Sequence, residues 1–531
     1  MKYLVLLALV VAALPNCGGT TDAPMATDAA VAADADVAAD TAQTDAMQEV
    51  ATEDIDPAVG AGPLLLQPGE VAEFVVTDGT TVAQVRTPLG TEKFVVILAS
   101  TRFDNPAKTY AYTAELDVSQ SPSSGTVVQG CALSLAWKNQ VLPEETPPFG
   151  VAAKLGDKRK LHMGSKSISA TIMAVGKLGV VWVDDTTPVD AAVITEFLKD
   201  FDDLILPRER TIFGMESDLD NDGHINLVFS PVTYETSVAY FTGCDLLPQV
   251  GCGDGNQGEF LYLTPPTAIK PPYNTPAAIK ETLAHELGHL IHFNRKVLRN
   301  NLQSWDDSSY MIEGAGGFTQ DVSGFQAGNL YVAMAGLDGI NDFSLASTLK
   351  DKTAYDMAKD GVLRGGSYWF VRYLYDRAGG DEAKPDGTLV SKGGPVLLHK
   401  LLESKASIAK TLPDIALQPI ADIAVDFYTA LAASNREEIG EALAQNSCFR
   451  FLPTALDPIT GKQRGGNVYA KFHGIGMKGP ASLPLAKADK KIRAGGVKYW
   501  QVNATADAPS LQVLVNADAD AQVRLRVLRV K

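Results

Sequence analysis

The chain has 531 residues, a formal net charge of −17 at pH 7, and 46% hydrophobic residues. Its length is sufficient for more than one folded domain. Its acidic balance argues against nucleic acid or an anionic membrane surface as a partner. Five cysteines in such a chain are typical of proteins from an oxidising compartment.

The first residues have the composition of an export signal. Lys2 precedes the apolar run LVLLALVVAAL, which is too short to span a bilayer. Cys17 follows shortly after, with two glycines behind it, and this arrangement resembles a bacterial lipoprotein signal, in which the cysteine becomes the lipidated first residue. We predict a signal peptide over residues 1–16 and an outer-membrane or cell-surface protein anchored through Cys17, with cleavage and secretion as the alternative.

An acidic segment follows the signal. Residues 17–60 are almost entirely Ala, Asp, Thr, Val and Glu, without a positive charge or an aromatic side chain. Such a segment repels itself and cannot bury a core. We predict a disordered spacer between the membrane anchor and the folded protein.

Two stretches of the chain are typical of β-structure. From residue 64 onward, segments such as EFVVTDG and KFVVILAST alternate apolar and polar residues between turn residues, which predicts a β-sandwich-like module over residues 61–160. QVRLRVLRV near the C-terminus predicts a second β-module over residues 450–531. Residues 165–445 mix strand patterns such as INLVFS with helix patterns such as PIADIAVDFYTALAAS. The predicted fold class is therefore α+β, with one large mixed domain between two β-modules.

The segment TPAAIKETLAHELGHLIHF, residues 275–293, dominates the central domain. Thr275 can cap the first turn of a helix, and Pro276 suits the first helical position. The apolar residues that follow recur at helical intervals. The pattern predicts a helix that carries His285, Glu286 and His289 in the order His-Glu-x-x-His.

These three residues predict a zinc site. Residues four apart lie on the same face of a helix, so that His285 and His289 can bind one ion. Zinc suits an imidazole pair, and Glu286 can take a proton from a water that the metal activates. The alternative interpretation, histidines without a function on an amphipathic helix, needs no such glutamate.

A catalytic zinc needs a third protein ligand. The pattern H-E-x-x-H-x-x-G-x-x-H is excluded, because positions 292 and 295 hold His and Arg. Glu313 lies in SSYMIEGAGGF, where the small residues 314–317 would allow a second helix to approach the first closely. We predict Glu313 as the third ligand, while Asp306, Asp307 and Asp321 remain alternatives on chemistry alone.

At this point the sequence resembles the gluzincins, whose third zinc ligand is a glutamate, and in particular the hyicolysin-like metallopeptidases. The resemblance rests on TLAHELGHLIHFN followed by EGAGG, with VWVDD, DLDNDGHINLVFSP and GGSYWFVRYLYDRAGG as further matches, and it covers about residues 165–385. It implies a zincin-like domain that hydrolyses proteins or peptides. His285, His289 and Glu313 would be the zinc ligands in that family pattern, and Glu286 would be the general base.

Three positions depart from the family pattern. Ile312 and His292 stand where asparagine is usual or common, and Gly317 replaces a carboxylate that supports the first zinc ligand in thermolysin-like relatives. The ligand set is unaffected by these changes. We expect Asp321 to support His285 in place of the missing carboxylate.

DLDNDGHI begins like a calcium-binding loop, with Asp218, Asp220 and Asp222 ahead of Gly223. The closing glutamate of such a loop is missing, because Phe229 occupies its position. A structural calcium site is one interpretation. A turn that leads into the following strand is the other.

Four cysteines remain if Cys17 is lipidated or removed. Cys244 and Cys252 are near enough in the chain to close a small loop, which leaves Cys131 to pair with Cys448 by elimination. A second metal cluster is the rival interpretation, but the paired C-x-x-C spacing of such sites is missing.

The sequence thus predicts an exported zinc metalloendopeptidase of the gluzincin type that acts on protein or peptide substrates. We expect a further donor to the oxyanion of the reaction, and the candidates are Tyr310, Tyr368, His292 and His399. The alternative is a surface-anchored binding protein whose zincin domain is a non-catalytic scaffold. The complete motif favours the enzyme, because a scaffold has no chemical need for Glu286.

Overall fold

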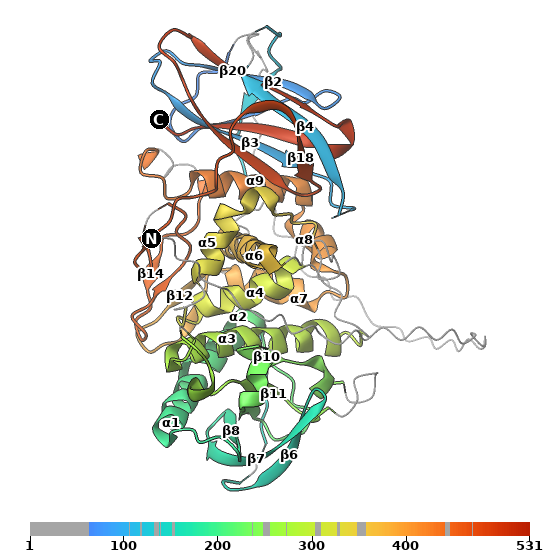
Figure 1. The fold of residues 1–531 in the computed structure, drawn as a ribbon, viewed down its shortest axis with the longest axis vertical. Helices are drawn as coiled ribbons and strands as arrows, with labels where there is room; N and C mark the ends of the chain where they lie inside the picture. Colours follow the sequence, from blue (N-terminus) through green and yellow to red (C-terminus); the bar gives the residue numbers. More distant parts are fainter. Residues whose placement is uncertain are drawn as a thin grey trace, which may run out of the picture.

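The computed structural model describes residues 63–531 with short gaps along the chain. The gaps are residues 106, 117–118, 132–136, 138–139, 151–153, 236, 248–254, 272, 303–308, 327–329, 348–356, 441–446 and 470. The predicted signal peptide, Cys17 and the acidic linker lie outside the described residues. Figure 1 shows three parts along the long axis of the molecule, with strands at each end and helices between them.

The strands of the N- and C-terminal segments form a single β-sandwich. One sheet has the order β19-β3-β21-β1-β5 and the other the order β18-β4-β20-β2, and side chains of both sheets share one buried core. The strand bounds are β1 Val71–Phe74, β2 Thr80–Arg86, β3 Lys93–Ser100, β4 Thr109–Leu116, β5 Gly125–Val127, β18 Ala486–Arg493, β19 Val497–Asn503, β20 Ser510–Ala517 and β21 Val523–Arg529.

The prediction of two separate β-modules was therefore wrong, although the strands themselves were found. Seven of the eight residues of β3 are buried, so this strand needs a hydrogen-bonding partner along both edges. Both partners, β19 and β21, come from the C-terminal segment. The pairing of strands some 400 residues apart leaves no mark in the local alternation of either segment.

A second sheet lies at the other end of the molecule, with the order β10-β11-β9-β8-β7-β6. Strands β8, β9 and β11 run parallel, and β10 pairs antiparallel with β11 at one edge. The predicted boundary at residue 160 falls inside β6, which pairs with β7 in this sheet. The bounds are β6 Lys158–Met163, β7 Lys166–Val175, β8 Gly179–Asp184, β9 Ile225–Phe229, β10 Ala239–Phe241 and β11 Phe260–Leu263.

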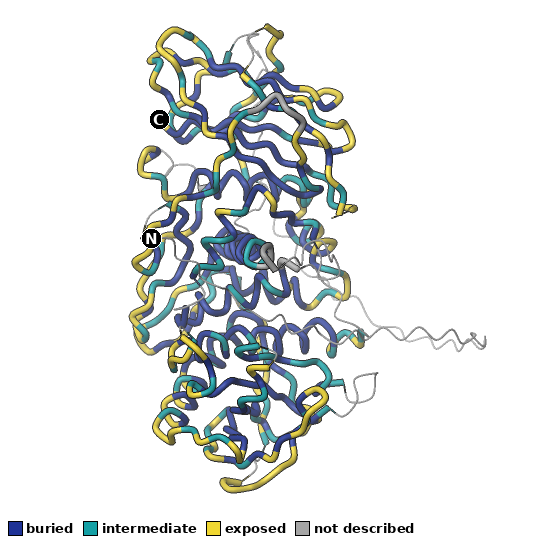
Figure 2. Tube along the Cα trace, in the orientation of Figure 1, coloured by how far each residue is buried: buried dark blue, intermediate teal, exposed yellow. Residues whose placement is uncertain are grey.

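Most helices lie between the two β parts, with α6 packed against α4 and α5, while α1 packs beside β7 and β8 of the second sheet. Figure 2 shows the central helices as largely buried, with most exposed positions in loops and at sheet edges. The helix bounds are α1 Ala191–Asp200, α2 Leu206–Phe213, α3 Pro276–Phe293, α4 Ser309–Val322, α5 Leu330–Asp338, α6 Met357–Ala378, α7 Gly394–Glu403, α8 Ile408–Ala416 and α9 Ile420–Ala433. This mixture of sheets and helices is an α+β architecture, as the sequence predicted.

Shorter elements complete the chain. Two π-helical turns follow α1 and α3, and they are η2 Phe201–Ile205 and η6 Asn294–Leu298. The 3-10 turns are η3 Pro231–Glu235, η4 Gly243–Asp245, η5 Pro266–Ala268, η7 Ile340–Asp342, η9 Ser447–Phe449 and η10 Ala519–Ala521. Three antiparallel strand pairs are β12 Asp381–Ala383 with β13 Leu389–Ser391, β14 Ala455–Leu456 with β15 Gln463–Arg464, and β16 Lys471–Phe472 with β17 Ile475–Gly476.

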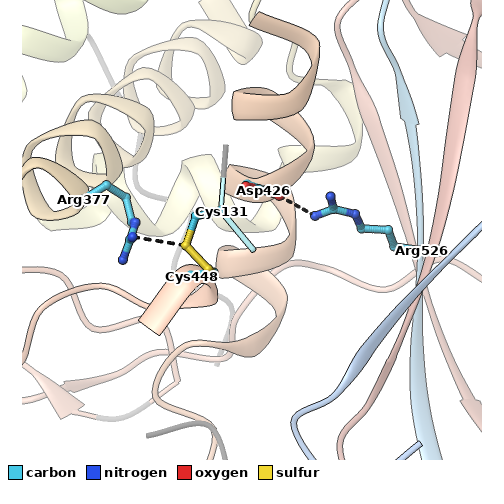
Figure 3. The surroundings of a disulfide bond; sticks show 5 residues. All are labelled: Cys131, Arg377, Asp426, Cys448 and Arg526. Atoms are coloured by element: carbon cyan, nitrogen blue, oxygen red, sulfur yellow. Dashed lines mark hydrogen bonds and ion pairs between the residues drawn. A yellow bond between two sulfur atoms is a disulfide. The ribbon is translucent and has the colours of Figure 1, made fainter. Parts of the chain in front are cut away.

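The disulfide between Cys131 and Cys448 confirms the predicted pairing, with a Cα–Cα distance of 5.1 Å across 317 residues of sequence. Figure 3 shows it beside Arg377, whose guanidinium donates to the sulfur of Cys131 over 3.2 Å. Cys244 is also disulfide-bonded, and its predicted partner Cys252 lies outside the described residues. These bonds fit the oxidising compartment that the cysteine content indicated.

The sandwich is attached to the helices by buried ion pairs as well as by apolar packing. Asp426 of α9 pairs with Arg526 of β21 at 2.7 Å, and both side chains are almost inaccessible to water (Figure 3). Glu73 of β1 pairs with the same arginine at 2.8 Å.

Within the described ranges, no single helix is long and apolar enough to span a membrane, and only α8 and α9 together, bent by 90° at their junction, meet that test.

Candidate metal centre

Helix α3 begins where the sequence predicts it. The hydroxyl oxygen of Thr275 accepts a hydrogen bond from the backbone N–H of Ala278 at 3.2 Å, and Pro276 occupies the first helical position. The helix packs against β10 and β11 on one side and against α4 on the other. Its apolar residues are buried in these contacts, which fixes the direction in which its polar residues point.

The structure brings together the three side chains that the sequence predicted as ligands. Nε2 of His285 lies 3.0 Å from Nε2 of His289 and 3.8 Å from Oε2 of Glu313 on α4. Ligand atoms of all three residues lie within 4.8 Å of one another. Of the competing carboxylates, Asp306 and Asp307 lie outside the described residues, and Asp321 lies elsewhere.

The chemistry of this cluster fits a zinc ion. Burial lowers the pKa of His289 to about 4, and burial, with His289 and Arg364 acting in the same direction, lowers the pKa of His285 well below its usual range. Both imidazoles are therefore neutral at neutral pH, and a neutral imidazole has a lone pair to offer a metal. Two imidazoles and one carboxylate are a donor set that zinc accepts.

Close packing of α3 against α4 allows this arrangement. A Cβ atom on Gly316 would lie 2.7 Å from the ring of His285, and one on Gly288 would lie 2.8 Å from Thr319. The Thr319 hydroxyl donates to the backbone oxygen of Ala284 at 2.9 Å, across the helix interface. The predicted role of small residues at 314–317 is confirmed for Gly316.

The other small residues of this run serve a different contact. A Cβ atom on Gly314 would lie 2.6 Å from the carbonyl oxygen of Ser367, and one on Gly317 would lie 3.7 Å from Tyr368, both on α6. Helices α3 and α6, which flank α4, therefore contact different small residues of the segment 314–317. Gly316 faces the candidate ligand His285, while Gly314 and Gly317 face α6.

The prediction that Asp321 supports His285 was wrong. The Asp321 carboxylate accepts hydrogen bonds from Tyr368 at 3.2 Å and from the backbone N–H of Gly465 at 2.8 Å. It also pairs with Arg372 at 3.1 Å. Asp321 is eight residues beyond Glu313 on α4, a rise of about 12 Å along the helix axis, so it cannot reach the same site. The ring of His285 instead lies against Gly316, where an added Cβ atom would be 2.7 Å from it.

Glu286 is positioned by the sheet. Its Oε2 accepts a hydrogen bond from the backbone N–H of Phe241, in the edge strand β10, at 3.0 Å. Burial, with the nearby charge of Glu313, raises the pKa of Glu286 to about 8. The carboxyl group therefore lies between the candidate ligands and the edge of the sheet.

Arg364 was not among the residues predicted for the site. Nη1 of this residue, on α6, lies 2.6 Å from Oε2 of Glu313. The motif GGSYWFVRYLYDRAGG that resembles the family begins at Gly365, the residue directly after Arg364. A usable signal was present in the sequence, because an arginine directly before a Gly-Gly pair in a predominantly apolar helix needs a buried anion or a route to water.

Two of the candidates for the oxyanion donor have partners outside the site. The hydroxyl of Tyr368 donates to Asp321, and Nε2 of His399 lies 3.2 Å from the backbone oxygen of Thr211. His292 is completely buried. The side chain of Tyr310 lies outside the part that the structure describes.

The acidic loop before β9 has features of a turn and also a cluster of carboxylates that could bind calcium. Ligand atoms of Asp218, Asp220 and Asp222 lie within 4.8 Å of one another, and burial, with the neighbouring Asp222, raises the pKa of Asp220 to about 6. The loop is also a turn, in which Asp218 accepts a hydrogen bond from the N–H of Gly223 at 3.0 Å. The buried carboxyl of Glu259 accepts from Leu219 at 3.1 Å in the same loop. Calcium binding here stays a prediction.

A third cluster lies beside a cavity of about 310 Å³ between α2 and α7. Glu145, His399 and Glu403 have ligand atoms within 4.8 Å of one another. The guanidinium of Arg295, which has no exposed side-chain surface, pairs with Glu145 and, at 2.8 Å, with Glu403. One permanent cation thus already pairs with both carboxylates.

No protein-family model matches the chain. Over 147 residues the chain is 28% identical to the neutral metalloprotease ShpI of Staphylococcus hyicus, and the alignment covers 26% of this chain and 33% of that protein. The chain thus matches about a third of the length of this curated relative. The similarity is distant and partial.

Proposed function

We propose that the chain is a zinc-dependent endopeptidase. The observation that carries the proposal is the convergence of His285, His289 and Glu313, with Glu286 on the same helix as the two histidines. Two histidines and one glutamate are the ligand set of a known class of catalytic zinc sites. The distant similarity to a neutral metalloprotease supports a metal-dependent proteolytic activity.

The residues divide the chemistry between them. When bound, zinc supplies Lewis acidity, which lowers the pKa of water and polarises a carbonyl group. Beside a bound dication, whose charge favours the ionised carboxylate and opposes the effect of burial, Glu286 would accept the proton of the attacking water and pass it to the leaving amine. The hydrogen bond from Phe241 fixes one oxygen of its carboxylate, so that Glu286 is oriented before a substrate arrives.

The edge strand β10 favours a peptide as the substrate. It is the outer strand of its sheet, and Glu286 is hydrogen-bonded to its last residue, Phe241. An extended peptide can add to an exposed sheet edge through backbone hydrogen bonds. A chain bound in this way would pass directly beside Glu286, which suits cleavage within a polypeptide.

The finer assignment is a zincin domain of the gluzincin type. It is supported by a His-Glu-x-x-His helix against a mixed sheet and by a glutamate ligand on the following helix. We further propose that the enzyme is exported and held at the cell surface through Cys17, with residues 17–60 as a spacer. The disulfide of Cys131 with Cys448 supports export.

The alternative is a surface-binding protein with a non-catalytic zincin scaffold. The single β-sandwich weakens the argument for it, because two flanking binding modules have become one unit attached to the helices by buried ion pairs. Calcium in the acidic loop would stabilise either protein. It does not distinguish between them.

The test is cleavage of an unfolded protein by the zinc-loaded chain and by Glu286→Gln. The account predicts one zinc ion per chain in both proteins and a loss of activity of about 10³-fold or more in the variant. Glu403→Gln, at a half-exposed glutamate of the third cluster, is the matched control and keeps full activity. Zinc binding without cleavage by the wild type would contradict the proposal and favour the scaffold.

A further inference from the structure

Arg364 is a cation inside the candidate metal centre. Its Nη1 lies 2.6 Å from Oε2 of Glu313, and only 17% of the arginine side chain and 14% of the glutamate side chain are exposed. The guanidinium therefore contacts one of the candidate ligands directly.

One oxygen of Glu313 faces two different groups. Oε2 lies 3.8 Å from Nε2 of His285 and 2.6 Å from the guanidinium of Arg364. A dication held by His285, His289 and Glu313 would compete with Arg364 for the charge of this carboxylate. Once Glu313 serves as a metal ligand, its charge is shared between the metal and the guanidinium, which lies beside the candidate ligands.

The proposed reaction creates a negative charge that such a group can stabilise. Attack of water on a peptide carbonyl gives a tetrahedral species with one anionic oxygen, and a preorganised donor in a shielded site stabilises this charge strongly. Guanidinium is always protonated and has five N–H donors in a rigid plane. Arg364 can therefore donate to an oxyanion without any proton transfer of its own.

Two of the residues first considered for this role are engaged elsewhere. Tyr368 donates to Asp321, and His399 is hydrogen-bonded to Thr211 beside a separate cavity. His292 is completely buried. Among the side chains that the structure describes, the cation that forms an ion pair with the candidate ligand Glu313 is Arg364.

We propose that Arg364 is a catalytic residue that donates to the oxyanion formed during peptide hydrolysis. The proposal rests on the proposed function, because it needs a peptide carbonyl beside the metal ligands. In the free protein the guanidinium forms an ion pair with Glu313. In the reaction it would donate hydrogen bonds to the new anionic oxygen instead.

The competing explanation is that Arg364 only positions Glu313. The two roles predict opposite changes in zinc affinity. A positioning residue supports its ligand, so that its removal would weaken zinc binding about 10–100-fold. An oxyanion donor that competes with zinc for Glu313 would, on removal, leave zinc affinity unchanged or raise it.

The experiment compares Arg364→Met and Arg364→Lys with the wild type. We measure zinc affinity by competition with a chromophoric chelator, kcat and KM on a fluorogenic peptide, and the Kd of a phosphinic peptide, whose anionic tetrahedral group mimics the oxyanion. Arg364→Met is expected to lower kcat about 10²-fold and to weaken the phosphinic peptide by a similar factor, with KM within about threefold and zinc affinity not reduced. Arg364→Lys keeps the charge and recovers part of both losses.

Arg210→Met is the matched control, because it removes an arginine of similar burial that pairs with Glu216 away from the site. It is expected to change neither kcat nor the Kd of the phosphinic peptide. An unchanged kcat in Arg364→Met, or a fall in zinc affinity parallel to the fall in kcat, would overturn the proposal. A wild type that binds zinc without cleaving any peptide would overturn the proposed function, and the role of Arg364 with it.

Discussion

Two groups of residues in this protein combine histidine and carboxylate at the spacing of a metal site, and they differ in charge balance. His285, His289 and Glu313 contain one carboxylate, and the paired arginine touches one of its oxygens. The cluster of Glu145, His399 and Glu403 has two carboxylates, and both pair with the buried Arg295.

The difference teaches that ligand chemistry and proximity do not by themselves define a metal site. In the cluster of Glu145, His399 and Glu403, the guanidinium of Arg295 already supplies the charge and the hydrogen bonds that a metal would supply. Two carboxylates that already share a buried guanidinium have less to gain from a further cation. In the α3–α4 cluster the two imidazoles are neutral and face each other, so that a dication is the partner that suits all three ligands.

Removing one histidine from each cluster gives the largest contrast. His289→Ala is expected to weaken zinc binding by about 10³-fold or more, because it removes one of three protein ligands. His399→Ala is expected to leave both the zinc content and the affinity unchanged. Metal analysis after dialysis against a weak chelator measures both, and loss of zinc from His399→Ala would invert the comparison.

Removing Arg295 tests whether its guanidinium is the reason that we expect no metal between Glu145, His399 and Glu403. Arg295→Met leaves the carboxylates of Glu145 and Glu403 without their buried partner, and we expect a loss of about 3 kcal/mol in the free energy of unfolding. Micromolar zinc should restore part of this loss, since Glu145, His399 and Glu403 then have room for a dication. Denaturant unfolding with and without zinc measures both effects. A variant as stable as the wild type would show that the guanidinium is not what satisfies this cluster.

Glu209 on α2 is a buried carboxyl for which the structure shows no ion pair among the described residues. It is completely buried, neither of its oxygens has a hydrogen-bond partner among the described residues, and burial raises its pKa well above the usual range. A carboxyl whose pKa is raised in the folded state stabilises that state below its unfolded pKa of about 4.3 and loses this contribution as pH rises.

Glu209→Met is therefore expected to raise the free energy of unfolding by about 2 kcal/mol at pH 8 and to change it little at pH 4. Unfolding curves at the two pH values measure the difference. An equal effect at both pH values would mean that packing, and not the charge, determines the stability at this position.

The smallest expected effect concerns the packing behind His285. Gly316→Ala places a Cβ atom 2.7 Å from the imidazole of His285, whereas Gly317→Ala places one 3.7 Å from its nearest neighbour. We expect the first change to weaken zinc binding about 10-fold by displacing a ligand. The second should leave zinc binding as it is. Equal zinc affinities in the two variants would contradict the close approach of α3 and α4.

The parts of this account that the sequence could predict are those with local causes. Helix α3 has its cap, its proline and its periodicity within 19 residues, and the strands of the sandwich alternate in the expected way. The union of the two β segments could not be predicted, because β3 finds its partners some 400 residues away. The same limit explains why the sequence favoured Asp321, whose actual partners, Arg372 and Gly465, lie far along the chain.

The charge balance of the clusters was also beyond the sequence. Glu313 was predicted from the small residues after it, and these do lie in close contacts with α3 and α6. Arg364 is 51 positions from Glu313 and Arg295 is 150 positions from Glu145, so no local pattern relates them. Only the fold shows that Glu313 faces two imidazoles and Arg364, while Glu145 and Glu403 share the buried Arg295.

The most direct test of the central claim is the position of zinc in crystals of the full chain, located by anomalous diffraction at the zinc absorption edge. The account predicts a strong peak between His285, His289 and Glu313, and none between Glu145, His399 and Glu403. A peak in the latter cluster, or a zinc-soaked crystal without a peak beside His285, would contradict the assignment of the metal centre.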